Sequence, residues 1–373
     1  MKILHISEYG LPDPRIERLA IMSSSYTESH FLGGLGHEIK LFENAFESIT
    51  NTDFFTTAGK SGIPYYYQKM KESILKEVDR IDPDIIYAHN VIAAKIVSDL
   101  PKPFIYDDHE YWSRQVLIKR VKNKSFFDKL KNRLRYFWLP KVYRKWEKKV
   151  LAKAASVVTV SEAIALEHRE KAGFCYVIPN FPLRQEIGEH HKPKAHSGNP
   201  KAICLSSDFG GFLEHRNPGT NLEAIQSVGG VEVDWVGRPP KPELTWFKHR
   251  DWIEPSSLLE VLTKNYQFGL IPWIDYWYHR YSMPNKAATY SHAGLIFVLN
   301  KDFKSIIHML PKYGYYTYEN QEELKVIIRK LRDLDTQELL KRRVNLQNWA
   351  RENVVLDKYA KTLRRAIEHA GVK

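Results

Sequence analysis

Short apolar runs alternate with amphipathic segments along the first half of the chain. Apolar runs of this length are typical of strands that are buried on both faces of a parallel sheet. The predicted strands of this half are residues 2–7, 85–89, 103–106, 156–160 and 176–179. Residues 30–32 are either a short strand or the end of a helix, and residues 36–42 are a candidate strand. The predicted helices begin near residues 16 and 161 and cover residues 69–81 and 91–100.

The alternation stops at residues 181–201, a polar segment with Pro, Gly and His and little periodicity. It resumes with the predicted strands 202–205, 231–236, 252–253, 268–272 and 295–299. The predicted helices of this half begin near residue 221 and cover residues 255–263, 285–293 and 321–373. Strands that alternate with helices predict an α/β fold of parallel sheets. We expect two Rossmann-like domains that face a cleft, residues 1–185 and 202–350, joined by a linker at residues 186–201.

Residues 281–299, YSMPNKAATYSHAGLIFVL, predict a loop, a short helix and a buried strand. Pro284 suits the first turn of that helix, and Gly294 suits its left-handed end. The helix N-terminus follows the predicted strand 268–272, and phosphates commonly bind at such a place. Lys286 adds a positive charge in the first turn. A Rossmann-like unit without a ligand has the same pattern, so this stretch alone leaves binding and plain packing equally open.

Composition narrows the class of protein without indicating its activity. The 373 residues are 43% hydrophobic and 27% charged, as in ordinary globular proteins, and the length suits two domains. Cys175 and Cys204 have no metal-ligand spacing and favour a reducing compartment. No apolar run is long enough to span a membrane, and the apolar part of MKILHIS is too short for a secretory signal. We therefore expect a cytoplasmic protein.

Positive charge is concentrated in one region. The net charge is +12, and residues 113–153 hold fifteen Lys and Arg against two acids. Leucine and aromatic side chains recur there at helical spacing, which predicts a basic amphipathic helix with an aromatic face. This face either packs on its own domain or enters an anionic membrane surface. Nucleic acid is the less favoured partner because no recognisable nucleic-acid module is present. The residues expected at the membrane or acceptor side are Phe126, Phe127, Lys129, Lys131, Arg133, Arg135 and Trp138.

Ten stretches match one family pattern in the same order along the chain. They read PDPRIERLA, PDIIYAHN, FIYDDHEYW, ASVVTVSEAI, VIPNFP, WVGRPP, DWIEPSSLLEVL, LIP, SMPNK followed by AGL, and a closing WAREN helix pair. Together they resemble the retaining GT-B glycosyltransferases, in the group called glycosyltransferase family 4. The resemblance implies transfer of a sugar from a UDP- or GDP-sugar to a glycan, glycolipid or lipid-linked acceptor. It also implies that residues 351–373 pack back on the first domain.

The resemblance implies roles only for positions that match the family pattern. His109 would face the donor sugar, with Glu110 beside it to orient the imidazole. The residues implied at the donor diphosphate are Gly210, Gly211, Arg216, Asn285 and Lys286. Those implied at the nucleotide base and ribose are Gly237, Ile253 and Thr289. A capping histidine in a loop and an exposed surface arginine are the structural alternatives for His109 and Arg216.

The chemistry of such a site requires positive groups, because a departing diphosphate gains negative charge as the glycosidic bond breaks. The sequence has no Asp-x-Asp motif after a strand, so we expect no metal and no other cofactor. Many members of the family carry two Glu where this chain has Tyr281 and Thr289, and Asp275 or Glu254 are the candidate replacements. This departure leaves a non-catalytic GT-B-like binding or scaffold protein, and a nucleotide-sugar epimerase or hydrolase, as alternatives to a glycosyltransferase.

Overall fold

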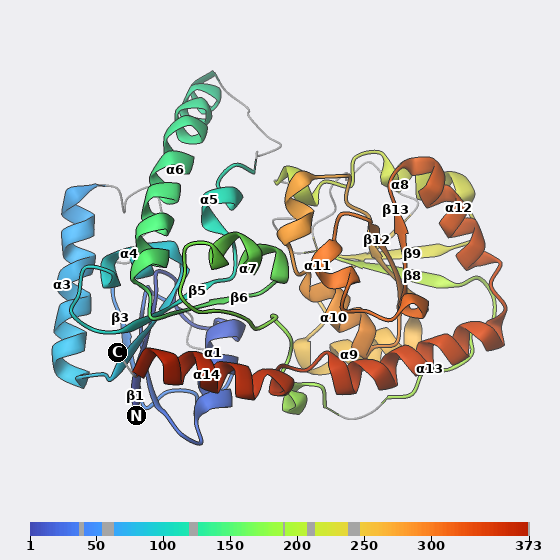
Figure 1. The fold of residues 1–373 in the computed structure, drawn as a ribbon. Coiled ribbons are helices and arrows are strands. Elements are labelled where there is room, and N and C mark those ends of the chain that lie inside the picture. The colour runs from blue at the N-terminus through green and yellow to red at the C-terminus, as the bar shows by residue number, and fades with distance from the viewer. Residues whose placement is uncertain are drawn as a thin grey trace. The chain divides into compact units, whose positions relative to one another are not determined.

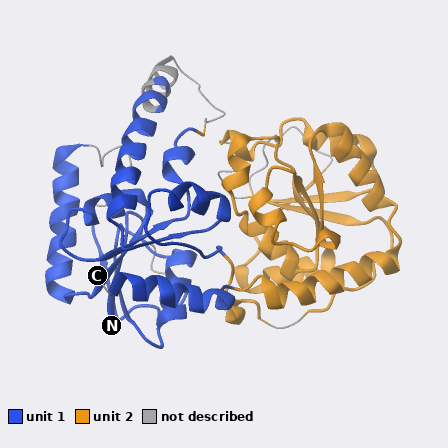
Figure 2. Cartoon of the chain, in the orientation of Figure 1, with its two compact units in different colours: residues 1–117, 133–180, 356–373 blue, residues 118–132, 181–355 orange. Residues whose placement is uncertain are grey.

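The structure is a computed structural model that describes residues 1–36, 41–53, 63–118, 126–188, 191–206, 213–237 and 247–371. Side chains are described in these ranges except at residues 126–132, 134 and 135. The chain forms two compact units (Figure 2). The first contains residues 1–117, 133–180 and 356–373, and the second contains residues 118–132 and 181–355. Apart from the segment 118–132, the units change after residues 180 and 355, where the sequence predicted boundaries at 185 and 350.

The first unit is built on a sheet of seven parallel strands in the order β3-β2-β1-β4-β5-β6-β7 (Figure 1). The strands are β1 Lys2–Ser7, β2 Glu28–Gly33, β3 Ser48–Asn51, β4 Ile85–His89, β5 Phe104–Asp108, β6 Ser156–Thr159 and β7 Cys175–Val177. Every residue of β4 and β5 is buried, including the polar residues His89, Asp107 and Asp108 at their ends. The strand order reverses between β1 and β4, and such a switch point is where open α/β sheets bind ligands.

Helices cover both faces of this sheet. They are α1 Pro14–Ser23, α3 Pro64–Ile81, α4 Asn90–Val97, α5 Trp112–Gln115, α6 Phe126–Lys153, α7 Glu162–Arg169 and α14 Ala360–Gly371. Leu4, Ile86 and Tyr106 point to one face, where they form the main core with side chains of α3, α4 and α6. On the other face the C-terminal helix α14 packs against α1 and the strands from β4 to β7 (Figure 1). The last helix of the chain therefore completes the first unit.

The second unit has a six-stranded parallel sheet in the order β10-β9-β8-β11-β12-β13. The strands are β8 Lys201–Leu205, β9 Glu232–Val236, β10 Lys248–Arg250, β11 Phe268–Ile271, β12 Ile296–Asn300 and β13 Tyr315–Tyr318. The helices are α8 Asn221–Val228, α9 Pro255–Asn265, α10 Asn285–His292, α11 Lys304–Ile307, α12 Gln321–Arg332 and α13 Thr336–Asn353. The order reverses between β8 and β11, so the second sheet has its own switch point. The predicted α/β class with two parallel sheets is confirmed.

Some predicted elements are corrected by the structure. The strand predicted at residues 252–253 is wrong, because Lys248–Arg250 pairs with β9 instead and Trp252 is 68% exposed. The segment predicted to be helical from residue 321 onward is helical in α12, α13 and α14, and Asp335 marks the start of α13 by accepting hydrogen bonds from two amides of its first turn. The candidate strand 36–42 lies mostly outside the described residues. Residues 30–32 belong to β2, which settles the alternative left open by the sequence.

Candidate functional site

Three polar residues follow the central strands of the first sheet at its carboxyl edge. Glu8 follows β1, Asn90 follows β4 and His109 follows β5. Because β1 and β4 form the switch point, this edge is the ligand-binding place expected of an open α/β sheet. The resemblance pointed to His109 alone. The signal that was missed for Glu8 is its position as the first charged residue after the apolar strand.

Asp107 organises a buried network next to His109. Its carboxylate accepts hydrogen bonds from Arg15 Nε at 2.9 Å and from Arg15 Nη2 at 2.7 Å. It also lies 3.0 Å from His89 Nδ1, and these three residues are at most 4% exposed. Burial alone would raise the pKa of Asp107, but Arg15 and the neighbouring imidazoles hold it well below its ordinary value. Asp107 is therefore a buried anion with a fixed orientation.

His109 is the member of this network that reaches solvent, with its side chain 14% exposed. Its Nδ1 lies 3.8 Å from Asp107 Oδ2, too far for a hydrogen bond, and has no hydrogen-bond partner among the described residues. Burial acts to lower the pKa of His109, and the charge of Asp107 outweighs this and raises it. The imidazole is thereby favoured in its protonated form, which donates hydrogen bonds. Asp107 is the carboxylate beside it, whereas Glu110 contacts Gln115 of α5.

Glu8 is a buried carboxyl at the same edge. It is 4% exposed, and both of its carboxyl oxygens are buried. Burial raises the pKa of Glu8 to about 8, against smaller lowering effects of its own backbone amide and of His109. Near neutral pH this carboxyl is mostly protonated. It can therefore donate a hydrogen bond to a ligand oxygen, which an ionised glutamate cannot do.

Two basic residues stand on either side of the switch point of the second sheet. Arg216 ends a short 3₁₀ helix, Glu214–Arg216, after β8, and Lys286 is the second residue of α10, after β11. Lys286 Nζ lies 5.0 Å from the centroid of the Trp273 ring. Burial, followed by the positive charge of Arg216, lowers the pKa of Lys286 to about 8. The two charges therefore act on one region, and an anion bound there would relieve their repulsion.

The other residues predicted to contact the nucleotide-sugar donor differ in their environments. Asn285 is the exposed first residue of α10, and Pro284 precedes the helix as its N-cap instead of entering the first turn. Thr289 Oγ1 donates to Asn285 O at 3.2 Å. Gly237 has a φ of +89°, and a Cβ there would lie 2.2 Å from Ser206 O, so only glycine fits. Ile253 is half-buried in the loop before α9. Gly210 and Gly211 lie outside the described residues.

A pocket of about 440 Å³ opens at the carboxyl ends of β11 and β13. It is lined by Asn221, Ile274, Asp275, Tyr318, Glu319, Asn320, Gln321 and Glu322. Its lining contains three carboxylates and no Lys or Arg, so it is unsuited to a diphosphate. A hydrogen bond with Asp302, together with burial, raises the pKa of Asp275. The basic pair, which does not line this pocket, remains the better diphosphate site.

The basic helix α6 has two parts. Tyr143, Val150 and Leu151 are buried in the core of the first unit, whereas Phe137 and Trp138 are 56% and 59% exposed. Lys141 Nζ lies 3.8 Å from the centroid of the Phe137 ring, and Arg133 is exposed. Of the other residues expected on this surface, Phe126, Phe127, Lys129, Lys131 and Arg135 have no described side chains. Core packing therefore accounts for the C-terminal part of α6, from Tyr143 onward. It does not explain why the rings of Phe137 and Trp138 are exposed.

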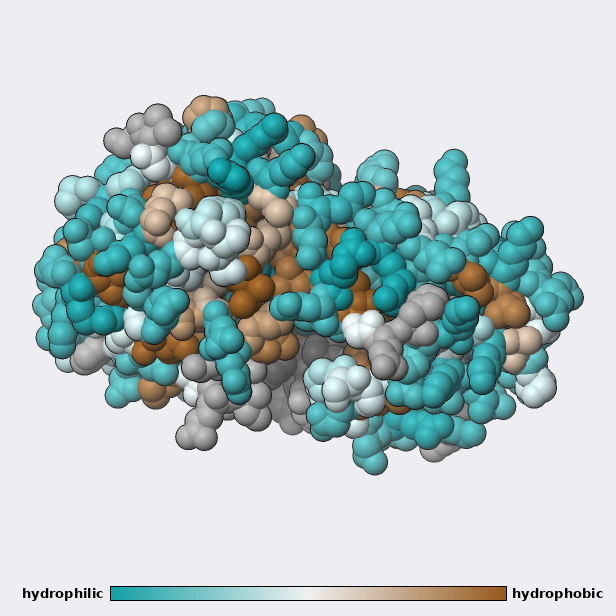
Figure 3. Space-filling model, turned by 90° about the horizontal axis from the view of Figure 1, so that it is seen from below, coloured by the Kyte–Doolittle hydropathy of each residue, from teal (hydrophilic) through white to brown (hydrophobic). Residues whose placement is uncertain are grey.

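In the described part of the chain, no helix combines the length and apolar composition that a membrane span requires. Figure 3 shows one face of the molecule, on which hydrophilic residues predominate and hydrophobic ones occur in small groups.

Comparisons with known proteins agree with this architecture. Residues 26–181 match the family described as Glycosyltransferase Family 4. No curated protein matches the chain. Sucrose-phosphate synthase from Thermosynechococcus elongatus has a similar structure, with a TM-score of 0.73 at 10% identity over 99% of this chain and 98% of that one.

Two further solved structures are similar over nearly their whole length. A glycosyltransferase from Rickettsia africae gives a TM-score of 0.68 at 12% identity over 99% of this chain and 98% of that one. Anabaena HepE in complex with UDP-glucose gives 0.65 at 13% identity over 99% of both chains. At such identities the likeness shows the fold, two Rossmann-like domains of the GT-B type, and leaves the reaction to the site residues.

Proposed function

We propose that this protein is a glycosyltransferase that moves a sugar from a nucleotide-sugar to a glycan, glycolipid or lipid-linked acceptor. The observation that carries the proposal is the pair Arg216 and Lys286 at the switch point of the second sheet. Lys286 holds its charge at a cost, because burial and Arg216 both lower its pKa. A bound diphosphate would offset that cost. The match of residues 26–181 to a glycosyltransferase family supports the same reading.

The proposed mechanism uses charge and orientation without a metal at the diphosphate. As the bond between the sugar and the diphosphate breaks, negative charge grows on the leaving group, and Arg216 and Lys286 stabilise it. His109 donates a hydrogen bond from its protonated imidazole to the donor sugar, and Asp107 keeps the imidazole charged. No protein nucleophile is assigned, and we propose that the configuration of the sugar is retained.

The donor is best sought among UDP-sugars. The solved HepE structure of this fold contains UDP-glucose, and GDP-sugars are the second choice from the sequence. Many members of the family carry Glu at the positions of Tyr281 and Thr289. In this proposal the loss of these two carboxylates changes the contacts to the ribose of the donor. A hydroxyl at Thr289 can accept one hydrogen bond but cannot hold a diol as a carboxylate does. We therefore expect weaker contacts to the ribose than a carboxylate would give.

Donor hydrolysis over UDP-, GDP- and dTDP-sugars, measured together with thermal shift, tests the proposal. We expect slow release of nucleoside diphosphate from one donor without added Mg²⁺ or Mn²⁺. His109→Ala should lower that turnover with little change in melting temperature, because the side chain lies at a strand end. Binding without turnover would instead indicate a scaffold protein, and an epimerised product would indicate an epimerase. Unchanged turnover in His109→Ala would remove this residue from the site.

We also propose that α6 attaches the protein to the cytoplasmic face of a membrane. Basic residues near an anionic surface contribute about 1 kcal/mol each, so binding to anionic liposomes should fall as salt rises. Phe137→Ser with Trp138→Ser should weaken co-sedimentation, because these exposed rings can enter the interface. Trp252→Ser, which removes an equally exposed ring from the second unit, is the control. Equal binding of wild type to neutral and anionic liposomes would contradict the electrostatic part.

A further inference from the structure

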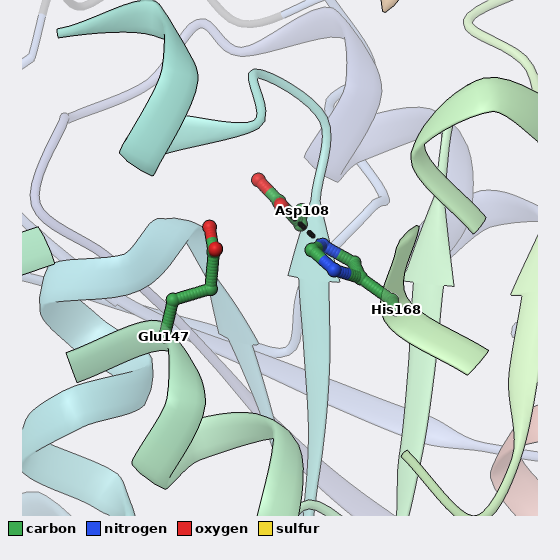
Figure 4. A group of neighbouring side chains, drawn as sticks. All are labelled: Asp108, Glu147 and His168. Carbon is green, nitrogen blue, oxygen red and sulfur yellow. Dashed lines mark hydrogen bonds and ion pairs between the residues drawn. The ribbon is translucent and has the colours of Figure 1, made fainter. Parts of the chain in front are cut away.

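A second polar cluster lies on the opposite face of β5 from the His109 network. Successive side chains of a strand point to opposite faces of a sheet, so Asp108 points away from the side that Asp107 occupies. It meets Glu147 of α6 and His168 of α7, and Figure 4 shows the three side chains converging from these elements. One ligand atom of each residue lies within 4.8 Å of those of the other two. The three residues are 0%, 5% and 1% exposed, respectively.

The hydrogen bonds of this cluster leave acceptor capacity unused. His168 Nε2 lies 2.7 Å from Asp108 Oδ2, whereas Asp108 Oδ1 has no hydrogen-bond partner among the described residues although it is fully buried. Glu147 is held in place by Ser113, whose Oγ donates to Glu147 Oε2 at 2.6 Å. A carboxylate oxygen buried without a partner carries a large desolvation cost. Asp108 therefore has an acceptor position that its contact with His168 does not fill.

The two acidic groups of the cluster also favour a bound cation. The cluster places two carboxyl groups beside one imidazole in an interior with little solvent. A cation or a shared proton between the carboxyl groups would reduce the repulsion between them. Ser113, Tyr106 and Tyr111 are among the residues that interact with its three side chains.

We propose that Asp108, Glu147 and His168 bind one divalent cation of the zinc class. One imidazole nitrogen and two carboxylate oxygens are a ligand set that Zn²⁺ accepts, with a fourth position left for water. Mg²⁺ and Ca²⁺ suit it less well, because they take oxygen ligands almost exclusively. A divalent ion balances the two carboxylates and gives Asp108 Oδ1 a partner. The ion would tie β5, α6 and α7 of the first unit together and so has a structural role.

This inference stands whether or not the protein transfers sugars, and its test uses metal uptake. The purified full chain should contain about one Zn²⁺ per molecule by elemental analysis. After removal of metal with a chelator, added ZnCl₂ should raise the melting temperature, and Co²⁺ should give the visible absorption of a low-symmetry site. Glu147→Gln and Asp108→Asn keep the size of the side chains and remove their negative charge. Each should weaken Zn²⁺ binding at least about 10–100-fold, the loss seen when even outer ligand partners are changed.

Controls separate this site from ordinary surface binding. Glu28 lies 3.0 Å from His30 but its side chain is 45% exposed, so Glu28→Gln should leave Zn²⁺ affinity unchanged. The competing explanation is a shared proton, and it predicts the opposite results. Glu147→Gln would then raise the melting temperature of the metal-free protein at alkaline pH, because it removes a buried like charge. Zn²⁺ would then protect the wild type no better than the Glu147→Gln variant. That pair of results would overturn the proposal.

Discussion

Lys286→Ala is expected to reduce kcat/KM for the donor by about 10²–10³-fold, the usual cost of losing one group that stabilises charge in the transition state. The reason lies in the surroundings of Lys286. Its ammonium lies over the Trp273 ring, and its pKa is lowered to about 8 by burial and by Arg216. Such a charge gains more from a diphosphate than an exposed lysine does. Initial rates over a range of donor concentrations, at pH 7, measure the effect.

The pH dependence of the same reaction provides an independent test of the role of Lys286. Lys286 loses its positive charge as pH rises through about 8, so KM for the donor in the wild type should increase above that pH. In Lys286→Ala this increase should be absent, because no group of that pKa remains at the position. A wild-type KM that stays constant from pH 7 to pH 9 would contradict the assignment of the charge to donor binding.

Arg216→Ala should cost a similar factor, and the double variant should lose less than the product of the two, because both groups act on one diphosphate. Lys264→Ala is the matched control. Lys264 lies in the last turn of α9 in the same unit and pairs with Glu260 at the surface, so its removal should leave kinetics unchanged. Equal kinetics for Lys286→Ala and Lys264→Ala would rule Lys286 out of the site.

Much of the fold could be predicted because the central strands are buried on both faces. A strand of this kind is apolar over most of its length, and Ile85–His89 and Ile296–Asn300 are fully buried, with a polar residue only at the last position of each. Local stereochemistry was equally informative. Gly294 has a φ of +64° at the end of α10, and the Ser161 side chain caps α7, as the sequence predicted.

The misses lie at the sheet edges. Tyr315–Tyr318 forms β13 with three of its four residues only half-buried, so its sequence has no continuous apolar run. Lys248–Arg250 is exposed at every position and is held at the edge by pairing with β9 and by an ion pair between Arg250 and Asp234. Neither strand is determined by burial. The hydrophobic pattern therefore could not reveal them.

The candidate site could be predicted only where a motif was local. His109 and Lys286 stand in short stretches that match a family pattern. The Arg15–Asp107 pair joins residues 92 positions apart, and nothing in either segment indicates the other. Asp107 and Asp108 are adjacent in the sequence. They nevertheless belong to different hydrogen-bond networks, because successive side chains of a strand point to opposite faces of the sheet. That separation becomes visible only when α1, α6 and α7 are in place.

Asp107→Asn is expected to destabilise the first unit by about 3–5 kcal/mol, the cost of removing one partner of a buried ion pair. For a unit of this size the loss corresponds to a fall in melting temperature of about 6–20 °C. Arg15 would keep its charge in a site that is 4% exposed, with the Ile178 carbonyl oxygen still accepting from Nη1. Calorimetry or circular dichroism at pH 7 measures the change.

The difference between wild type and Asp107→Asn should also depend on pH. The pKa of Asp107 is held well below its ordinary value of 3.8, so its stabilising effect is complete above that value and is lost as pH falls through the folded-state pKa. Asp82→Asn is a close control. Asp82 Oδ1 lies 2.7 Å from Lys102 Nζ, the same distance that joins Asp107 to Arg15 Nη2, but the Asp82 side chain is 85% exposed. This surface pair should contribute at most about 1 kcal/mol. Equal losses in the two variants would show that burial does not set the strength of the Asp107 network.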